Sequence, residues 1–257
     1  MKVTFDSNVW RIVSSPDSFP NENAIAEFSR IHDAIAQGKL EAYLAETVFT
    51  LEAVKKSGRH QFLADYKANV SFEETEQSDG SLGISMGIGP DPNDHPGNNP
   101  YLSKHWADAE KIGFKILHCP RLAAVKNPDV KPEWFVPVTH DIAEWFGAIA
   151  RDIEEQGCGI SQLKAIGQTY SPSYEPWHAG ISAAPDSEEN SIAKAVAEWA
   201  DGDAISAHYA YGNDYVCTRD IAKSAGNSSV FSAANRTWLE KRFGVKFLTP
   251  EELARLV

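Results

Sequence analysis

A stretch near the end of the chain, residues 201–220 (DGDAISAHYAYGNDYVCTRD), constrains the fold more than any other. Asp203 opens an alanine-rich run, which predicts a helix that can lie close against a sheet. A turn sequence follows, and the apolar residues 215–217 then predict a short buried strand. Thr218 and Asp220 come at the carboxyl end of that strand, where α/β sheets bind ligands. Because side chains alternate along a strand, we expect the Thr218 hydroxyl and the Asp220 carboxylate to point into one crevice.

The beginning of the chain offers a matching strand. Residues 2–5 form a short run with apolar side chains that stops abruptly at Asp6, Ser7 and Asn8. A second strand therefore also ends in a carboxylate. Together with Asp203 at the predicted helix start, these strand ends place three acids around one crevice.

With both stretches in view, the chain resembles the PIN-domain family of metal-dependent ribonucleases. Four motifs occur in the order that the family has them: FDSNV, DAISA, GNDYVCTRD and VKFLTPEEL. The resemblance covers about residues 1–68 and 189–257. It implies an α/β fold of the PIN-like three-layer α/β/α kind, with a central parallel sheet.

The resemblance divides the chain into three segments. Residues 1–70 and 189–257 are expected to be the two halves of the PIN domain. Residues 71–188 are expected to be a large, mostly helical and loop insertion, appended to the sheet rather than part of it. At its entry, residues 77–99 are rich in glycine, proline, asparagine and aspartate without periodicity, which predicts a loop.

Within the insertion the expected elements are a helix opened by Ser103, a strand-like run over 114–118 and an amphipathic helix over 141–156. Residues 167–185 are rich in aromatic residues and proline, which fits either a lid over a substrate or a cover for the insertion's own core. The acidic residues of 91–94 lack the spacing of a calcium-binding loop.

The resemblance places a further acid on the helix after the second strand. Residues 40–46 (LEAYLAE) predict that strand, and Glu52 lies on the helix expected after it, with Glu41 and Glu46 as nearby competitors. Without the resemblance, Glu52 and Lys56 are an i,i+4 pair of the kind that usually lies on a solvated helix face.

The resemblance implies a catalytic site made of four acids: Asp6, Glu52, Asp203 and Asp220. Carboxylates crowded into one crevice raise one another's pKa unless a divalent cation is present, and all-oxygen ligation favours Mg²⁺ or Mn²⁺. Asp6 and Asp203 are expected to bind metal directly, Asp220 to bind a second or weaker metal, and Glu52 to bind metal or orient the attacking water. Thr218 and Ser7 are expected to support these ligands.

The implied activity is that of an Mg²⁺- or Mn²⁺-dependent endoribonuclease, which hydrolyses RNA phosphodiester bonds with a metal-activated water. The family includes toxins of toxin–antitoxin pairs, so the resemblance implies an RNA substrate and leaves an antitoxin protein open as a partner. One alternative is a degenerate PIN-like module that binds RNA or protein without cleavage. Another is a phosphotransfer enzyme or phosphatase with a nucleophilic aspartate, which is weakened because Asp6 is followed by Ser-Asn rather than by x-Asp.

Composition bounds these expectations. The 257 residues contain neither a long apolar run nor a charged-then-apolar leader, so we expect a cytoplasmic protein without a membrane partner, and a homo-oligomer stays open. Three cysteines without metal-ligand spacing predict free thiols. The net charge of −12 argues against a generic basic nucleic-acid surface, although metal ions in a carboxylate site would invert the local potential.

Overall fold

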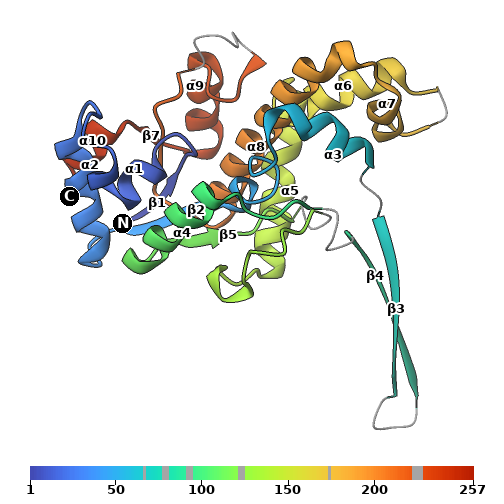
Figure 1. The fold of residues 1–257 in the computed structure, drawn as a ribbon, viewed down its shortest axis with the longest axis horizontal. Helices are drawn as coiled ribbons and strands as arrows, with labels where there is room; N and C mark the ends of the chain where they lie inside the picture. The colour runs from blue at the N-terminus through green and yellow to red at the C-terminus, as the bar shows by residue number, and fades with distance from the viewer. Residues whose placement is uncertain (66–67, 77–80, 91–94, 121–124, 173–174, 222–227) are drawn as a thin grey trace.

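The central feature is a five-stranded parallel sheet (Figure 1). This computed structural model describes residues 1–257 except 66–67, 77–80, 91–94, 121–124, 173–174 and 222–227, and it leaves the side chains of 68–73 and 85–90 undescribed. The strands are β1 (Lys2–Phe5), β2 (Glu41–Ala45), β5 (Lys115–Leu117), β6 (Tyr215–Cys217) and β7 (Phe247–Leu248). Their order across the sheet is β5-β2-β1-β6-β7, and every pairing is parallel. The expected α/β class with a central parallel sheet is confirmed.

Helices cover both faces of this sheet, because its strands are apolar on both sides. One face packs against α1 (Trp10–Ser14), α2 (Ile25–Ala36), α4 (Pro100–Ile112) and α10 (Pro250–Ala254). The other face packs against α5 (His140–Glu155), α8 (Glu189–Ala210) and α9 (Ala233–Phe243). Farther out, α3 (Arg59–Asp65), α6 (Ser161–Tyr170) and α7 (Trp177–Ala183) pack around α8.

The strand register sets which side chains meet. Val3 pairs with Ala42 of β2 and Tyr215 of β6, and all three contact the cluster that contains α1, α2 and α4. Val216, one register position along β6, faces α5, α8 and α9 instead. Because β1 and β6 are parallel and Phe5 pairs with Cys217, the carboxyl ends of the two strands lie at the same edge of the sheet.

The helix α8 differs from the expectation. The sequence predicts one helix over 189–199 and a second one opened by Asp203, but a single helix runs from Glu189 to Ala210. Gly202 does not interrupt it, because this glycine lies against Gly159 so closely that a Cβ would be 2.9 Å from the Gly159 Cα. The glycine is therefore needed for helix packing, and Asp203 lies in the middle of a helix rather than at its start.

Part of the expected insertion belongs to the sheet. Strand β5 lies within residues 71–188, yet it pairs with β2, and α4 packs into the same cluster as β1. The expectation that the segment is only appended to the sheet is therefore wrong for these elements. The physical reason is that Ile116 and Leu117 complete the apolar faces of the sheet beside β2.

The expected loop over 77–99 is in part a strand. β4 (Leu82–Pro90) pairs antiparallel with β3 (Ala68–Glu76), and the two-stranded ribbon extends away from the rest of the fold (Figure 1). Glycine-rich alternation in β4 concealed the strand pattern. Residues 91–94, where the calcium loop was considered, lie outside the described residues.

Residues 167–185 form packed helices over much of their length. Trp177 packs against the core cluster that includes α5 and α8, and the Tyr170 hydroxyl donates to Glu188 Oε1 at 3.0 Å. Residues 173–174 lie outside the described residues. These two aromatic side chains therefore support the expectation of a cover for the core more than that of a lid.

Several local expectations are confirmed. Apolar residues recur at helical spacing over 24–37 and 141–156, and helices α2 and α5 occur there, although α4 begins at Pro100 rather than Ser103. The sequence Thr249-Pro250-Glu251-Glu252 predicts a capping box, and Thr249 and Glu252 form one at α10. The three cysteines are free and buried. Among the described residues, no helix combines the length and the apolar character needed to cross a membrane.

Candidate carboxylate site

The candidate site lies where the strand order of the sheet reverses. From β1, the chain builds outward through β2 and β5 on one side and through β6 and β7 on the other. In open parallel sheets the crevice beyond the carboxyl ends of two such strands is the usual ligand site. Here these ends carry Asp6 after β1 and the segment 218–220 after β6.

Asp6 is held in one orientation by three donors. Its Oδ1 accepts from the Ser7 backbone N–H at 2.6 Å, and its Oδ2 accepts from the Asn8 side chain at 2.7 Å and the Thr218 hydroxyl at 2.5 Å. Burial raises the pKa of Asp6, the hydrogen bonds from Thr218 and Ser7 oppose that rise, and the charge of Asp220 adds to it. Thr218 and Ser7 therefore hold the Asp6 carboxylate in place.

Asp220 is fixed to the same corner by the backbone. The Thr218 hydroxyl accepts from the Asp220 backbone N–H at 2.9 Å, and Arg236 of α9 donates to the Asp220 backbone carbonyl. The Arg236 guanidinium also lies over the Phe247 ring, 4.8 Å from its centroid. Arg236 thus brings a half-buried positive charge beside the two strand-end acids.

Glu52 lies on a turn rather than on the expected helix. A 3₁₀ turn at Glu46–Val48 follows β2, and the backbone N–H of Glu52 then bonds to the Thr47 carbonyl at 3.0 Å. This tighter path brings Glu52 beside Asp6. Burial raises the pKa of Glu52 to about 7, the charge of Asp6 adds to the rise, and Ser7 partly offsets it through a side-chain hydrogen bond.

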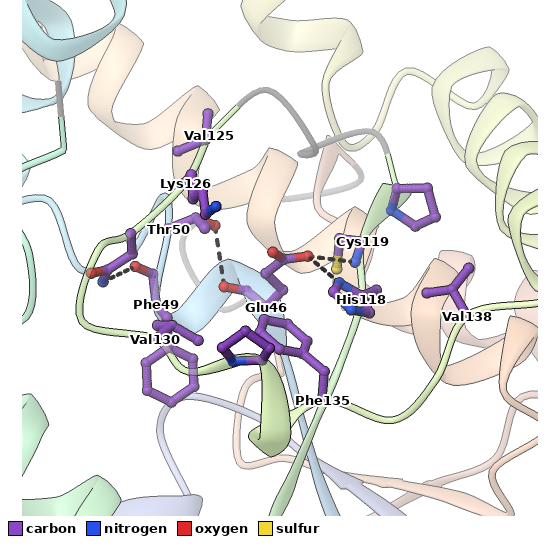
Figure 2. Close-up of a pocket in the computed structure, with 13 residues that line it drawn as sticks. Glu46, Phe49, Thr50, His118, Cys119, Val125, Lys126, Val130, Phe135 and Val138 are labelled. Carbon is purple, nitrogen blue, oxygen red and sulfur yellow. Dashed lines mark hydrogen bonds and ion pairs between the residues drawn. The ribbon is translucent and has the colours of Figure 1, made fainter. Parts of the chain in front are cut away.

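The two competitors of Glu52 lie elsewhere. Glu41 begins β2 at the opposite edge of the sheet and accepts a hydrogen bond from the Tyr43 hydroxyl at 2.7 Å. Glu46 lines a separate hollow of about 420 Å³ at the ends of β2 and β5 (Figure 2). There Glu46 Oε2 is 3.4 Å from His118 Nδ1 and accepts from the Cys119 backbone N–H at 2.9 Å, as Figure 2 shows.

On α8 the acid that faces this crevice is Asp201. Burial raises the pKa of Asp201 well above its ordinary value, and the charges of Asp6, Glu52 and Asp220 raise it further. These four carboxylates are half-buried, so solvent reaches them. Asp201 is the first residue of the stretch 201–220, but its sequence pattern did not mark it as a site residue.

Asp203, which we expected to bind metal directly, faces away from the crevice. It is fully buried, and its Oδ2 accepts from the Trp199 indole N–H at 2.9 Å. Its charge raises the pKa of Cys119, beyond the end of β5, after burial has raised it. Because residues two apart on a helix point about 200° apart, Asp201 and Asp203 cannot both face Asp6.

A fifth acid, Glu198, supports the site from one turn earlier on α8. Only 7% of Glu198 is exposed, and its Oε1 accepts from the backbone N–H groups of Gly159 at 3.2 Å and Val230 at 2.7 Å. Glu198 therefore ties the loop after β6 to the turn after α5. Sequence reasoning missed it, although its i,i+3 spacing from Asp201 was a signal once the helix was known to be continuous.

Glu198 predicts a pH dependence of stability. Burial raises its pKa from 4.5 to about 7, so the folded protein holds this proton more tightly than the unfolded chain does. Stability from this group is then fully present below pH 4.5 and is lost as the pH rises towards 7. One pKa unit corresponds to 1.36 kcal/mol, so this group should lower the free energy of unfolding by about 3 kcal/mol as the pH rises from 4.5 to 7. Glu198→Gln should abolish this part of the pH dependence, as measured by urea unfolding at several pH values. Glu240→Gln, an exposed change on α9, is the matched control. A wild-type pH slope in Glu198→Gln would contradict the prediction.

The donor chemistry of the cluster suits Mg²⁺ or Mn²⁺, because every donor is a carboxylate oxygen and the acids repel one another. Within the described part of the chain, however, no three His, Cys, Asp or Glu side chains stand close enough to form a metal-binding group as they lie. The cluster thus offers the right donors, while convergence on one ion requires side-chain rotation.

The fold and the site define the class: an α/β protein with a cluster of carboxylates at the point where the order of its parallel strands reverses. Comparison of the chain with family models, with curated proteins and with solved structures finds no match. The resemblance to PIN domains therefore remains a prediction from the sequence motifs.

Proposed function

We propose that the chain is an Mg²⁺- or Mn²⁺-dependent endoribonuclease of the PIN-domain type. The observation that carries the proposal is the convergence of four acids from four separate segments on one crevice: Asp6, Glu52, Asp201 and Asp220. Repulsion among partly buried carboxylates costs stability, so their convergence is more readily explained by a cation-dependent function than by packing.

In this proposal Asp6, Asp201 and Asp220 are the metal ligands, and Asp201 replaces Asp203 in the role that the motifs suggested. A bound divalent ion would supply a water of lowered pKa and neutralise charge on the phosphodiester. The Ser7 amide and the Thr218 hydroxyl fix the orientation of the Asp6 carboxylate. Glu52, with a pKa of about 7, is suited to accept a proton from the attacking water near neutral pH.

The test is cleavage of a fluorescently labelled RNA and of the DNA of the same sequence, with Mn²⁺ and with EDTA. We expect the RNA to be cleaved in Mn²⁺ but not in EDTA, and the DNA to be cleaved in neither. Binding of RNA without any cleavage in Mn²⁺ or Mg²⁺ would overturn the proposal in favour of the alternative, a non-cleaving PIN-like binding module. No observation on the chain favours an antitoxin, so the proposal is limited to RNA.

A further inference from the structure

A recess of about 200 Å³, with a mixed polar and apolar lining, adjoins the carboxylate cluster on the side of Glu52. Its lining includes Ser7 and Glu52 from the cluster, Tyr101 from α4, and two arginines, Arg11 from α1 and Arg59 from α3. Two guanidinium groups therefore stand beside a site made of negative charges. In a chain whose net charge is −12, such a local concentration of positive charge calls for an explanation.

Arg11 is available to a ligand. Its guanidinium lies over the half-exposed ring of Tyr101, 5.4 Å from the ring centroid. None of the ion pairs between described residues includes Arg11. Helix α1 begins directly after the turn that carries Asp6, so the position of Arg11 is tied to that of the cluster.

Arg59 has unused donors. Its Nε donates to the Val54 carbonyl at 3.3 Å, and its Nη1 donates to the Ala193 carbonyl at 3.1 Å. These two carbonyls orient the guanidinium and use two of its five N–H groups, and the charges of Glu52 and Asp201 also act on it. The group is therefore held rigidly, at the edge of the recess, with donors to spare.

We propose that this recess is a phosphate-binding subsite, in which Arg11 and Arg59 hold an RNA phosphate adjacent to the phosphodiester at the carboxylate cluster. The inference rests on the proposed ribonuclease function. Planar guanidinium groups match phosphate oxygens in geometry. Two cations beside the cluster also give a polyanionic substrate an attractive path to an otherwise repulsive site.

The opposing interpretation is that both arginines only offset the charge of Glu52. The two interpretations differ in the salt dependence of RNA binding. Each phosphate contact to a single strand contributes about 0.7 to the slope of log K against log salt, whereas an internal charge pair contributes nothing to it. Arg11 is the residue to replace, because Arg59 also supports the backbone.

The experiment measures fluorescence anisotropy of a short labelled oligouridylate at several NaCl concentrations, with Ca²⁺ in place of Mn²⁺ and RNA integrity checked on gels. Arg11→Gln should weaken binding by about tenfold, the effect of one charge-assisted hydrogen bond, and lower the slope by about 0.7. Arg11→Lys should keep the slope. Arg151→Gln, which removes an exposed arginine of α5, is the matched control and should bind like the wild type.

Two outcomes overturn the inference: no RNA binding by the wild type, or an unchanged salt slope of RNA binding in Arg11→Gln. If Arg11-dependent binding is found but no cleavage occurs in Mn²⁺, the ribonuclease proposal fails while the phosphate subsite stands. If cleavage occurs and Arg11→Gln binds normally, the subsite alone fails.

Discussion

Replacing Asp201 with asparagine is expected to abolish Mn²⁺-dependent RNA cleavage while the protein stays folded. The substitution keeps the shape of the side chain and removes one negative charge from a position on which the charges of Asp6, Glu52 and Asp220 all act. A metal ion stabilises the charge of such a transition state by several kcal/mol, and each 1.36 kcal/mol corresponds to a tenfold change in rate. The cleavage rate should therefore fall by more than about 100-fold. Asp6→Asn should have the same effect.

The matched control is Asp203→Asn, two residues away on the same helix. An asparagine at this position can still accept the Trp199 indole N–H through its amide oxygen, so cleavage should stay within about threefold of wild type. Circular dichroism and thermal unfolding show whether each variant is folded. In the metal-free state Asp201→Asn should be at least as stable as the wild type, because a repelling carboxylate has been removed. If Asp203→Asn were inactive and Asp201→Asn active, the placement of the site on α8 would be wrong.

Addition of Mn²⁺ or Mg²⁺ is expected to raise the melting temperature of the wild-type protein. Binding to the folded state alone stabilises it by about 2.7 kcal/mol when the free metal is at 100 times its dissociation constant. For a chain of 257 residues, 1 kcal/mol shifts the midpoint by about 2–4 °C, so a rise of roughly 5–10 °C is expected. Differential scanning calorimetry in chelated and metal-containing buffer measures the difference.

NaCl at matched ionic strength is the first control, since a merely solvated acidic surface responds to screening by any salt. The second control is the Asp6→Asn plus Asp220→Asn double variant, which removes both strand-end ligands. An equal Mn²⁺-induced shift in wild type and double variant would place the metal elsewhere in the protein.

Much of the scaffold follows from local sequence patterns. The short apolar runs that end in Asp6 and in Thr218-Arg219-Asp220 predicted β1 and β6, and the crevice between their ends was predicted from the properties of parallel sheets. Helix α2, strand β2 and the capping box at Thr249 were likewise predictable, because apolar periodicity and cap chemistry act over a few neighbouring residues.

The sequence by itself determined that acids end two neighbouring strands, and only the tertiary structure decided which further acids join them. Whether Asp201 or Asp203 faces Asp6 depends on the rotation of α8 about its axis, which the close contact of Gly202 with Gly159 fixes. Glu52 is the acid beside Asp6, rather than Glu46, because the chain after β2 turns tightly instead of forming a helix. These outcomes depend on contacts between residues far apart in the chain, and such contacts leave no periodic signal in the local sequence.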